Sequence, residues 1–275
     1  MAEYEIKDNI CIIKEGVVSI DKNEFHGEKI EGVELPSTLE KIGNYAFRQS
    51  ALKSVTIPCN IKKMGQEAFG CCPSLQTVTI QEGVKTIGSQ VFYRDYALEN
   101  VSLPESLTKI GESAFNQCKM IKSIMIPAKI KAISNWTFNC CSSLKTVVFA
   151  EGSKLTEIGN GAFYRTAIES MVLPKGVKKI GHDAFHDCIA LKSITLPDGL
   201  EEINFSAFEG YSSLESINIP ASLVNIHDYG RPPYRMFGGC TSLKNITVDP
   251  ANPAYVLKDG KLMTKDLQIQ IFPVE

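Results

Sequence analysis

Nine cysteines are the most reactive side chains in this 275-residue sequence, and their spacing determines which chemistry is open to them. Zinc sites are built from C-x-x-C pairs, and a nucleophilic thiolate needs a partner base. The sequence has no C-x-x-C pair, because Cys71-Cys72 and Cys140-Cys141 are adjacent. Five thiols instead each follow a phenylalanine by three residues, at Cys72, Cys118, Cys141, Cys188 and Cys240. We therefore predict a structural column of small buried thiols.

The densest polar segment is His182-Asp183-Ala-Phe-His186-Asp187-Cys188. Two histidines four residues apart on a helical turn can share a metal ion. No glutamate follows His182 to complete an H-E-x-x-H signature, and the Ala-Phe pair already belongs to a pattern found elsewhere in the chain. We expect a solvated turn here and no metal site.

The motifs of the common enzyme classes are missing from the sequence. It has no G-x-S-x-G nucleophile elbow, no phosphate-binding G-x-x-x-x-G-K-[ST] loop and no dinucleotide-binding G-x-G-x-x-G. The glycines recur at the spacing of a repeat, as turn residues do. We expect no catalytic residue, no metal and no cofactor.

Charge and hydropathy narrow the classes of partner. The 29 basic and 31 acidic residues give a formal charge of -2, which does not favour nucleic acid or an anionic membrane. No apolar run reaches the length of a membrane span. The N-terminal residues lack the basic region and apolar core of a signal peptide. The sequence as written predicts a cytoplasmic protein with reduced thiols; a secreted or cell-surface protein is the alternative if the natural chain begins upstream of Met1.

The strongest feature of the sequence is an internal repeat. The phrase L-x-x-I-x-I/L-P is complete at 52–58, 98–104, 121–127, 168–174, 191–197 and 214–220, and less regular copies begin at Ile30, Leu75, Leu144 and Leu243. Copies start 22–24 residues apart, except for one interval of 29. A second phrase, L-x-x-I-G-x-x-A-F-x-x-C, follows each proline and is complete at 107–118.

Each repeated position has a physical interpretation. Alternation predicts a strand in which Val55 and Ile57 face inward while Thr56 faces water, and Pro58 ends the strand. We expect the Ala-Phe pair to be buried on a short helical turn. The glycine after the isoleucine is predicted to adopt a positive φ or a tight bend, at Gly43, Gly65, Gly88, Gly111, Gly159 and Gly181.

These phrases resemble the BspA-like (Treponema-type) leucine-rich repeats over roughly residues 13 to 275. The resemblance implies a curved, right-handed solenoid, with a parallel β-sheet on one face and short helical turns or extended segments on the other. It also implies an adhesin role in some members. Gln81, Ala150 and Asp249 depart from the pattern at the proline, and Asp95 and Tyr211 depart from it at the cysteine.

The repeats suggest three segments. Residues 1–29 are interpreted as an N-terminal cap and half-repeat, 30–248 as leucine-rich repeats, and 249–275 as a capping hairpin. The turn signal Asp259-Gly260 is expected to join strands at 255–257 and 267–271.

Two surfaces are candidates for partner binding. Most outward positions of the strands are small and polar, but Met125, Val148 and Val172 form an apolar strip, unless the valines only reflect β-propensity. The interval of 29 contains a six-residue insertion, whose interface-type side chains are Tyr229, Arg231, Tyr234 and Arg235. The alternative is a tolerated surface loop.

The sequence therefore predicts a non-catalytic scaffold that binds another protein through its exposed sheet face. The alternative is a cell-surface or secreted adhesin that binds a host matrix protein or a glycan. We expect no nucleic acid and no membrane insertion. Neither the identity of the partner nor the oligomeric state follows from the sequence.

Overall fold

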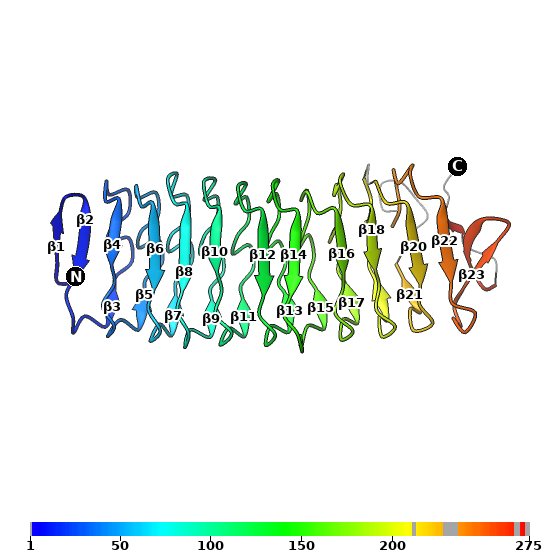
Figure 1. Ribbon diagram of the computed structural model, residues 1–275, viewed down its shortest axis with the longest axis horizontal. Helices are drawn as coiled ribbons and strands as arrows, with labels where there is room; N and C mark the ends of the chain where they lie inside the picture. The colour runs from blue at the N-terminus through cyan, green and yellow to red at the C-terminus, as the bar shows by residue number, and fades with distance from the viewer. Residues whose placement is uncertain (1, 211–212, 228–235, 267–269, 273–275) are drawn as a thin grey trace.

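The computed structural model describes residues 2–210, 213–227, 236–266 and 270–272. The chain winds into a parallel β-solenoid of about nine turns, which Figure 1 shows stacked in a row with little curvature. Each turn contributes one longer strand to one face and one two-residue strand to a second, parallel array. The hydrophobic core runs along the row between the two arrays.

The strands have regular bounds. The longer strands are β2 (Ile10–Ile13), β4 (Gly32–Glu34), β6 (Ser54–Ile57), β8 (Thr77–Ile80), β10 (Asn100–Ser102), β12 (Ser123–Ile126), β14 (Thr146–Phe149), β16 (Ser170–Val172), β18 (Ser193–Thr195), β20 (Ser216–Ile219) and β22 (Asn245–Val248). The two-residue strands are β3 (Ser19–Ile20), β5 (Lys41–Ile42), β7 (Lys63–Met64), β9 (Thr86–Ile87), β11 (Lys109–Ile110), β13 (Ala132–Ile133), β15 (Glu157–Ile158), β17 (Lys179–Ile180), β19 (Glu202–Ile203) and β21 (Asn225–Ile226). The ends add β1 (Tyr4–Lys7), β23 (Tyr255–Lys258), β24 (Lys261–Thr264) and β25 (Gln270–Phe272).

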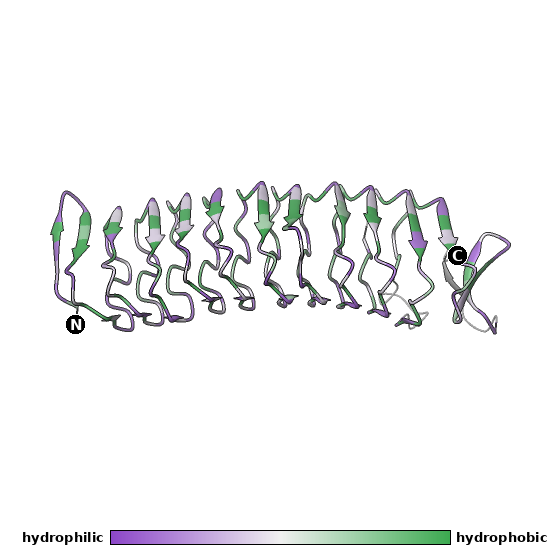
Figure 2. Cartoon of the chain, turned by 60° about the horizontal axis from the view of Figure 1, so that its bottom comes forward, coloured by the Kyte–Doolittle hydropathy of each residue, from purple (hydrophilic) through white to green (hydrophobic). Residues whose placement is uncertain are grey.

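Hydrophobic alternation sets the orientation of each long strand. In β6, Val55 and Ile57 are buried while Ser54 and Thr56 are exposed, as the sequence predicts. The pairing of β6 with β8 is in register, so Val55 lies beside Val78. Figure 2 shows the same alternation of hydrophobic and hydrophilic residues along the row of strands.

A ladder of stacked phenylalanine rings runs through the core. Neighbouring rings have centroids 5.0–5.9 Å apart and planes within 14° of parallel, at Phe25, Phe47, Phe69, Phe92, Phe115, Phe138, Phe163, Phe185, Phe208 and Phe237. The ring of Tyr4 packs against Phe25 in a T-shaped arrangement at the first end. One ring per repeat is therefore in contact with the ring of the next repeat.

The segments around the Ala-Phe pairs are not helical, which corrects our expectation. The described residues contain strands and turns but no helix. Ser113 and Gln117, which flank Ala114-Phe115, have φ values of 54° and 63°, and such left-handed residues interrupt a right-handed helix. The backbone bonds between repeats instead: the N–H of Phe115 donates to the carbonyl of Thr137 at 3.0 Å. The Ala-Phe segments of successive repeats are thus joined to one another by backbone hydrogen bonds.

Of the two alternatives predicted for the glycines after the isoleucines, a positive φ or a tight bend, the positive φ is wrong, since none of the six is in the left-handed region. A Cβ at Gly111 would lie 2.6 Å from the carbonyl carbon of Gly88, and a Cβ at Gly65 would lie 2.4 Å from the backbone nitrogen of Asn44. These glycines let the backbones of successive repeats approach closely.

Both ends of the row are closed by antiparallel strands. At the first end β1 pairs with β2, which pairs in parallel with β4. At the other end β23 pairs with β24 around Asp259-Gly260, so the strand that follows the predicted turn is 261–264 and not 267–271. The strand β25 joins as a third strand. Asn252 fastens this cap, because its buried amide donates to the carbonyls of Pro220 and Leu223 at 2.8 and 2.9 Å.

We predict that Phe115→Ala lowers the free energy of unfolding by about 3–5 kcal/mol, since it removes a buried ring from the middle of the ladder. The measurement is a urea titration followed by circular dichroism. Lys129→Ala, at an exposed side chain of the next repeat, serves as the control and changes stability by less than about 0.5 kcal/mol. Similar small losses in both variants would show that the ladder does not hold the repeats together.

Candidate interaction surface

The candidate surface lies on the sheet face, at strands β12, β14 and β16. Met125, Val148 and Val172 point outward with exposed fractions of 61%, 44% and 71%. Met125 and Val148 are direct neighbours in the register of β12 and β14. Elsewhere on this face the equivalent positions are polar, as at Thr56 and Ser102. The structure therefore brings together the first two residues of the predicted strip.

Val172 lies across an interruption of the sheet. The strands β12 and β14 form one hydrogen-bonded unit and β16 to β22 form another, and no backbone hydrogen bond joins the described strands β14 and β16. The opposite array is continuous over the same repeats, because β13, β15, β17, β19 and β21 form one sheet. The interruption is thus confined to the sheet face.

The sequence after β14 also departs from the repeat. Ala150 stands where most repeats have the strand-ending proline, and the interval from Leu144 to Ile168 is 24 residues where 23 is usual. The turn after β14 is therefore longer. Its backbone still bonds to the preceding repeat, with the N–H of Lys154 on the carbonyl of Ala128 at 2.8 Å.

The interruption opens a hollow with apolar walls. It has a volume of about 670 Å³ and is lined by both strands and the turns that follow them, including Val148, Val172 and Pro174. The inward residues of β14, Val147 and Phe149, are only half-buried, whereas the inward residues of most other long strands are buried. The hollow is thus lined by apolar residues from both faces of β14, the outward Val148 and the inward Val147 and Phe149.

A second interruption, between β10 and β12, shows what is special about this hollow. There too the inward residues Val101 and Leu103 are half-buried. The nearby hollow is smaller, about 230 Å³, and polar residues such as Thr79, Asn100 and Ser102 line it. An interruption alone therefore does not make an apolar surface. The outward residues of the flanking strands determine whether the hollow is apolar or polar.

The charges around the candidate surface are paired between repeats. The ammonium of Lys145 lies 3.2 Å from the carboxylate of Glu169, across the interruption. Similar exposed pairs bridge other repeats, as for Lys122 with Glu99 and Lys178 with Glu201. Such pairs contribute little to stability. Among the residues that line the hollow, Lys175 is the one charged side chain, so the surface is poor in charge.

The second predicted surface cannot be compared with the structure. Tyr229, Arg231, Tyr234 and Arg235 lie outside the described residues.

The cysteine column is structural, as predicted. The thiols of Cys72, Cys118 and Cys141 are buried and donate to the carbonyl of the phenylalanine one repeat earlier, at 3.0–3.1 Å. Cys188 and Cys240 do the same. Burial raises the pKa of Cys188 to about 11, so this thiol stays protonated and is a poor nucleophile. The nine cysteines, all of which lie within the described residues, form no disulfide bond.

Asp95 takes the place of a cysteine in this column and is fully buried. Its Oδ1 accepts the backbone N–H of Cys72 at 2.7 Å, while Oδ2 has no partner in the described structure. Burial raises the pKa of Asp95 well above its ordinary value. The raised pKa favours the protonated carboxylic acid, so the group that replaces the thiol is buried and unsatisfied at Oδ2.

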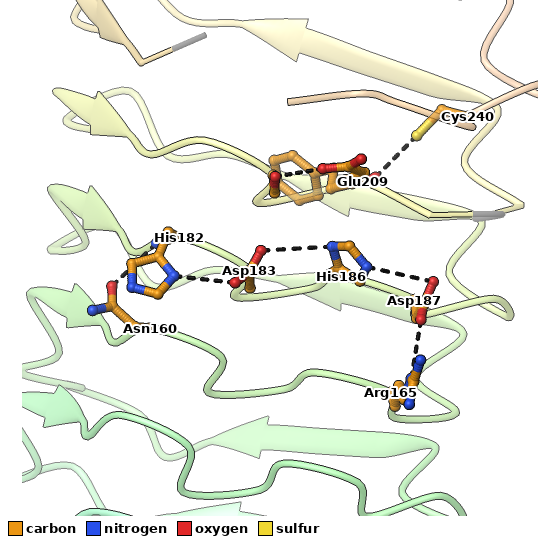
Figure 3. Close-up of polar contacts among 10 residues, drawn as sticks. Asn160, Arg165, His182, Asp183, His186, Asp187, Glu209 and Cys240 are labelled. Atoms are coloured by element: carbon orange, nitrogen blue, oxygen red, sulfur yellow. Dashed lines mark hydrogen bonds and ion pairs between the residues drawn. The ribbon is translucent and has the colours of Figure 1, made fainter. Parts of the chain in front are cut away.

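The histidine segment forms a chain of polar contacts on the turn side, shown in Figure 3. His182 and His186 contact the two different oxygens of Asp183, at 3.2 and 3.6 Å. Asp187 accepts from Arg165 at 3.0 Å. The neighbouring carboxylate of Asp183 raises the pKa of His186 above its ordinary value. The imidazoles flank a carboxylate and do not converge, and among the described residues no group of three ligands could hold a metal ion.

Sequence reasoning missed an aromatic cluster beside these histidines. The rings of Trp136, Tyr164, His182 and Phe205 lie within 5.1–6.3 Å of a neighbouring ring. Gly161 makes room for it, because a Cβ there would lie 2.1 Å from the indole. The equivalent residues of the neighbouring repeats, Trp136 and Asp183, have the same positive φ without being glycine. Gly161 is therefore needed because it has no side chain, and not because of its backbone conformation. The sequence feature that could have predicted this cluster is the one tryptophan, Trp136, with Gly161 at the equivalent position of the next repeat.

Comparison with known proteins agrees with this architecture. The family described as "BspA type Leucine rich repeat region (6 copies)" matches residues 18–145, 64–174 and 156–256. No curated protein matches the chain. Within the described part of the chain, no helix is long and apolar enough to cross a membrane.

Several solved structures have a similar fold. A leucine-rich cell surface protein from Faecalibacterium prausnitzii is 27% identical, with a TM-score of 0.59 over 90% of this chain and 76% of that one. A leucine-rich repeat protein from Bacteroides ovatus is 25% identical, with a TM-score of 0.54 over 87% and 66%. The pneumococcal vaccine antigen PcpA, at 22% identity and a TM-score of 0.56 over 91% and 66%, shares the fold.

We predict that Asp95→Cys stabilises the protein at neutral pH by about 1–3 kcal/mol, the usual cost of an unsatisfied buried group. Because folding raises the pKa of Asp95, its contribution is fully present below the unfolded pKa, near 3.9, and is lost as the pH rises through the folded pKa. The advantage of the variant should therefore grow with pH, measured by urea titrations from pH 4 to 8. Glu105→Gln, at an exposed carboxylate, is the control. An advantage that does not change with pH would contradict a neutral Asp95.

Proposed function

The chain belongs to the BspA-type leucine-rich-repeat family, and we propose that it is a non-catalytic binding protein whose sheet face at β12, β14 and β16 takes a protein partner. The observation that carries this proposal is the coincidence of two features at one place. The outward strip of Met125, Val148 and Val172 adjoins the hollow where Val147 and Phe149 are half-buried.

The chemistry of this surface suits the centre of a protein interface. Such centres are apolar and poor in charge, and contiguous exposed apolar patches mark contact sites. Here Lys145 and Glu169 neutralise one another at the edge, and Lys175 is the one charged residue among those that line the hollow. A partner that inserts apolar side chains into the hollow would remove both the strip and the half-buried residues from water.

The preference of valine for strands is the competing explanation of the strip. It accounts for Val148 and Val172. It does not account for Met125, and it does not account for the accessible inward face of β14. These two observations favour a binding surface.

We further propose that the protein acts at the cell surface or is secreted, in place of the cytoplasmic location expected from its N-terminal residues. The similarity to a bacterial cell surface protein over 90% of this chain supports this location. In that setting the partner is a host matrix protein, with a glycan as the second candidate.

We predict that changing Met125, Val148 and Val172 together to aspartate weakens partner binding at least tenfold, about 1.4 kcal/mol, because three charges would be desolvated in the contact. Binding is measured by surface plasmon resonance on a panel of purified matrix proteins and immobilised glycans. The three side chains are exposed, so circular dichroism should show an unchanged fold.

The matched control carries aspartate at Thr56, Ser102 and Asn218, which are exposed positions of the same face away from the hollow. It should bind as the parent protein does. Equal affinity of parent and strip variant for a bound ligand would contradict the proposed surface, and binding to glycans alone would favour the second candidate.

A further inference from the structure

The first end of the solenoid has an open strand edge. Among the described strands β1 pairs with β2 alone, and all four residues of β1 are exposed. Figure 1 shows β1 as the outermost element of the row, with the rest of the chain on its other side. An open edge of this kind is a template for pairing with another strand.

The ladder with β2 determines which backbone groups are available. The N–H of Lys14 donates to the carbonyl of Glu3, so residues 3 and 14 form a hydrogen-bonded pair. Hydrogen-bonded and non-bonded pairs alternate in an antiparallel ladder, and Ile6 lies opposite Cys11 in a non-bonded pair. The N–H and carbonyl of Ile6 therefore point away from β2, toward the open edge.

The side chains of β1 suit a copy of the same strand. Ile6 is 51% exposed, and Tyr4 beside it is also exposed. Glu5 and Lys7, on the opposite face of the strand, form no ion pair with any described residue. Charges of opposite sign thus flank a central isoleucine.

Charge complementarity selects one antiparallel register between two copies. Centring the pair on Ile6 places each Glu5 opposite the second copy's Lys7 and brings the outward N–H and carbonyl of both Ile6 residues together. Centring it on residue 5 or 7 would oppose like charges, which is destabilising across strands. The register that satisfies the hydrogen bonds therefore also pairs the charges.

We propose that two copies of this chain associate end to end through antiparallel pairing of their β1 strands, centred on Ile6. The interface is isologous, since the same strand serves both copies. The two solenoids extend in opposite directions from it. Because the strand is short, association is reversible and depends on concentration. The sheet face at β14 and β16 stays free, so this dimer does not depend on the proposed function.

Charge reversal tests the register directly. Sedimentation velocity is run on the whole protein up to about 1 mM, which covers weak association. The parent should dimerise. Glu5→Lys and Lys7→Glu should each be monomeric, because each opposes like charges. An equimolar mixture of the two variants should dimerise again, and so should the double variant, because both restore opposite charges.

Ile6→Pro tests the backbone contribution. Proline removes only the N–H that points to the open edge, and an edge strand tolerates this. The variant should keep the circular dichroism of the parent and lose the dimer. Monomers at every concentration of the parent would overturn the proposal. Dimers that survive charge reversal, or a mixture that does not recover, would equally overturn it.

Discussion

The phenylalanine ladder is the interaction on which the rest of the structure depends. Its rings are 5.0–5.9 Å apart, a spacing close to the 4.7–4.9 Å between hydrogen-bonded strands. Each turn must therefore rise by the same amount in the core and at the surface. The glycines of the Ile-Gly positions let the backbones meet at that rise, and the left-handed residues beside each Ala-Phe pair direct their N–H groups to the next repeat.

The continuity of the ladder makes the interruption at β14 and β16 tolerable. Phe138 and Phe163 remain stacked at 5.7 Å across it, and the backbone of Phe138 donates to Ala162 at 2.9 Å. The opposite array is also unbroken there. The core can thus lose strand pairing on one face without separating the repeats. A binding hollow needs this freedom, because its apolar walls must stay accessible while the fold is held elsewhere.

Much of the fold could be predicted from the sequence, because ten copies of one pattern identify a strand position more reliably than a single copy does. The strand positions, the inward pairs and the thiol column needed only the repeat and the alternation of Val55 and Ile57. The helical turn was a wrong prediction, since left-handed φ values at residues such as Ser113 and Gln117 have no clear signature in non-glycine residues. The role of Gly111 was misread because its neighbour, Gly88, is one repeat away.

The candidate site was only partly predictable for a similar reason. Met125, Val148 and Val172 could be identified as outward residues from the pattern. The interruption between β14 and β16 has no reliable signature in the residue types, because β10 and β12 are also unpaired although the repeat between them keeps Pro104 and the usual interval of 23 residues. The aromatic cluster of Trp136, Tyr164, His182 and Phe205 joins side chains from four different repeats, and only the fold shows that they meet.

Residue-resolved hydrogen exchange tests most directly the claim that the ladder side holds the solenoid while the sheet face is open at β14 and β16. The N–H groups of Ser170 and Val172 face the interruption, whereas those of Ser193 and Thr195, one repeat later, face a paired strand. We expect fast exchange at Ser170 and Val172, and slow exchange at Ser193, Thr195 and the ladder-side amide of Phe138. Equally slow exchange at Val172 and Thr195 would show a continuous sheet and contradict this account.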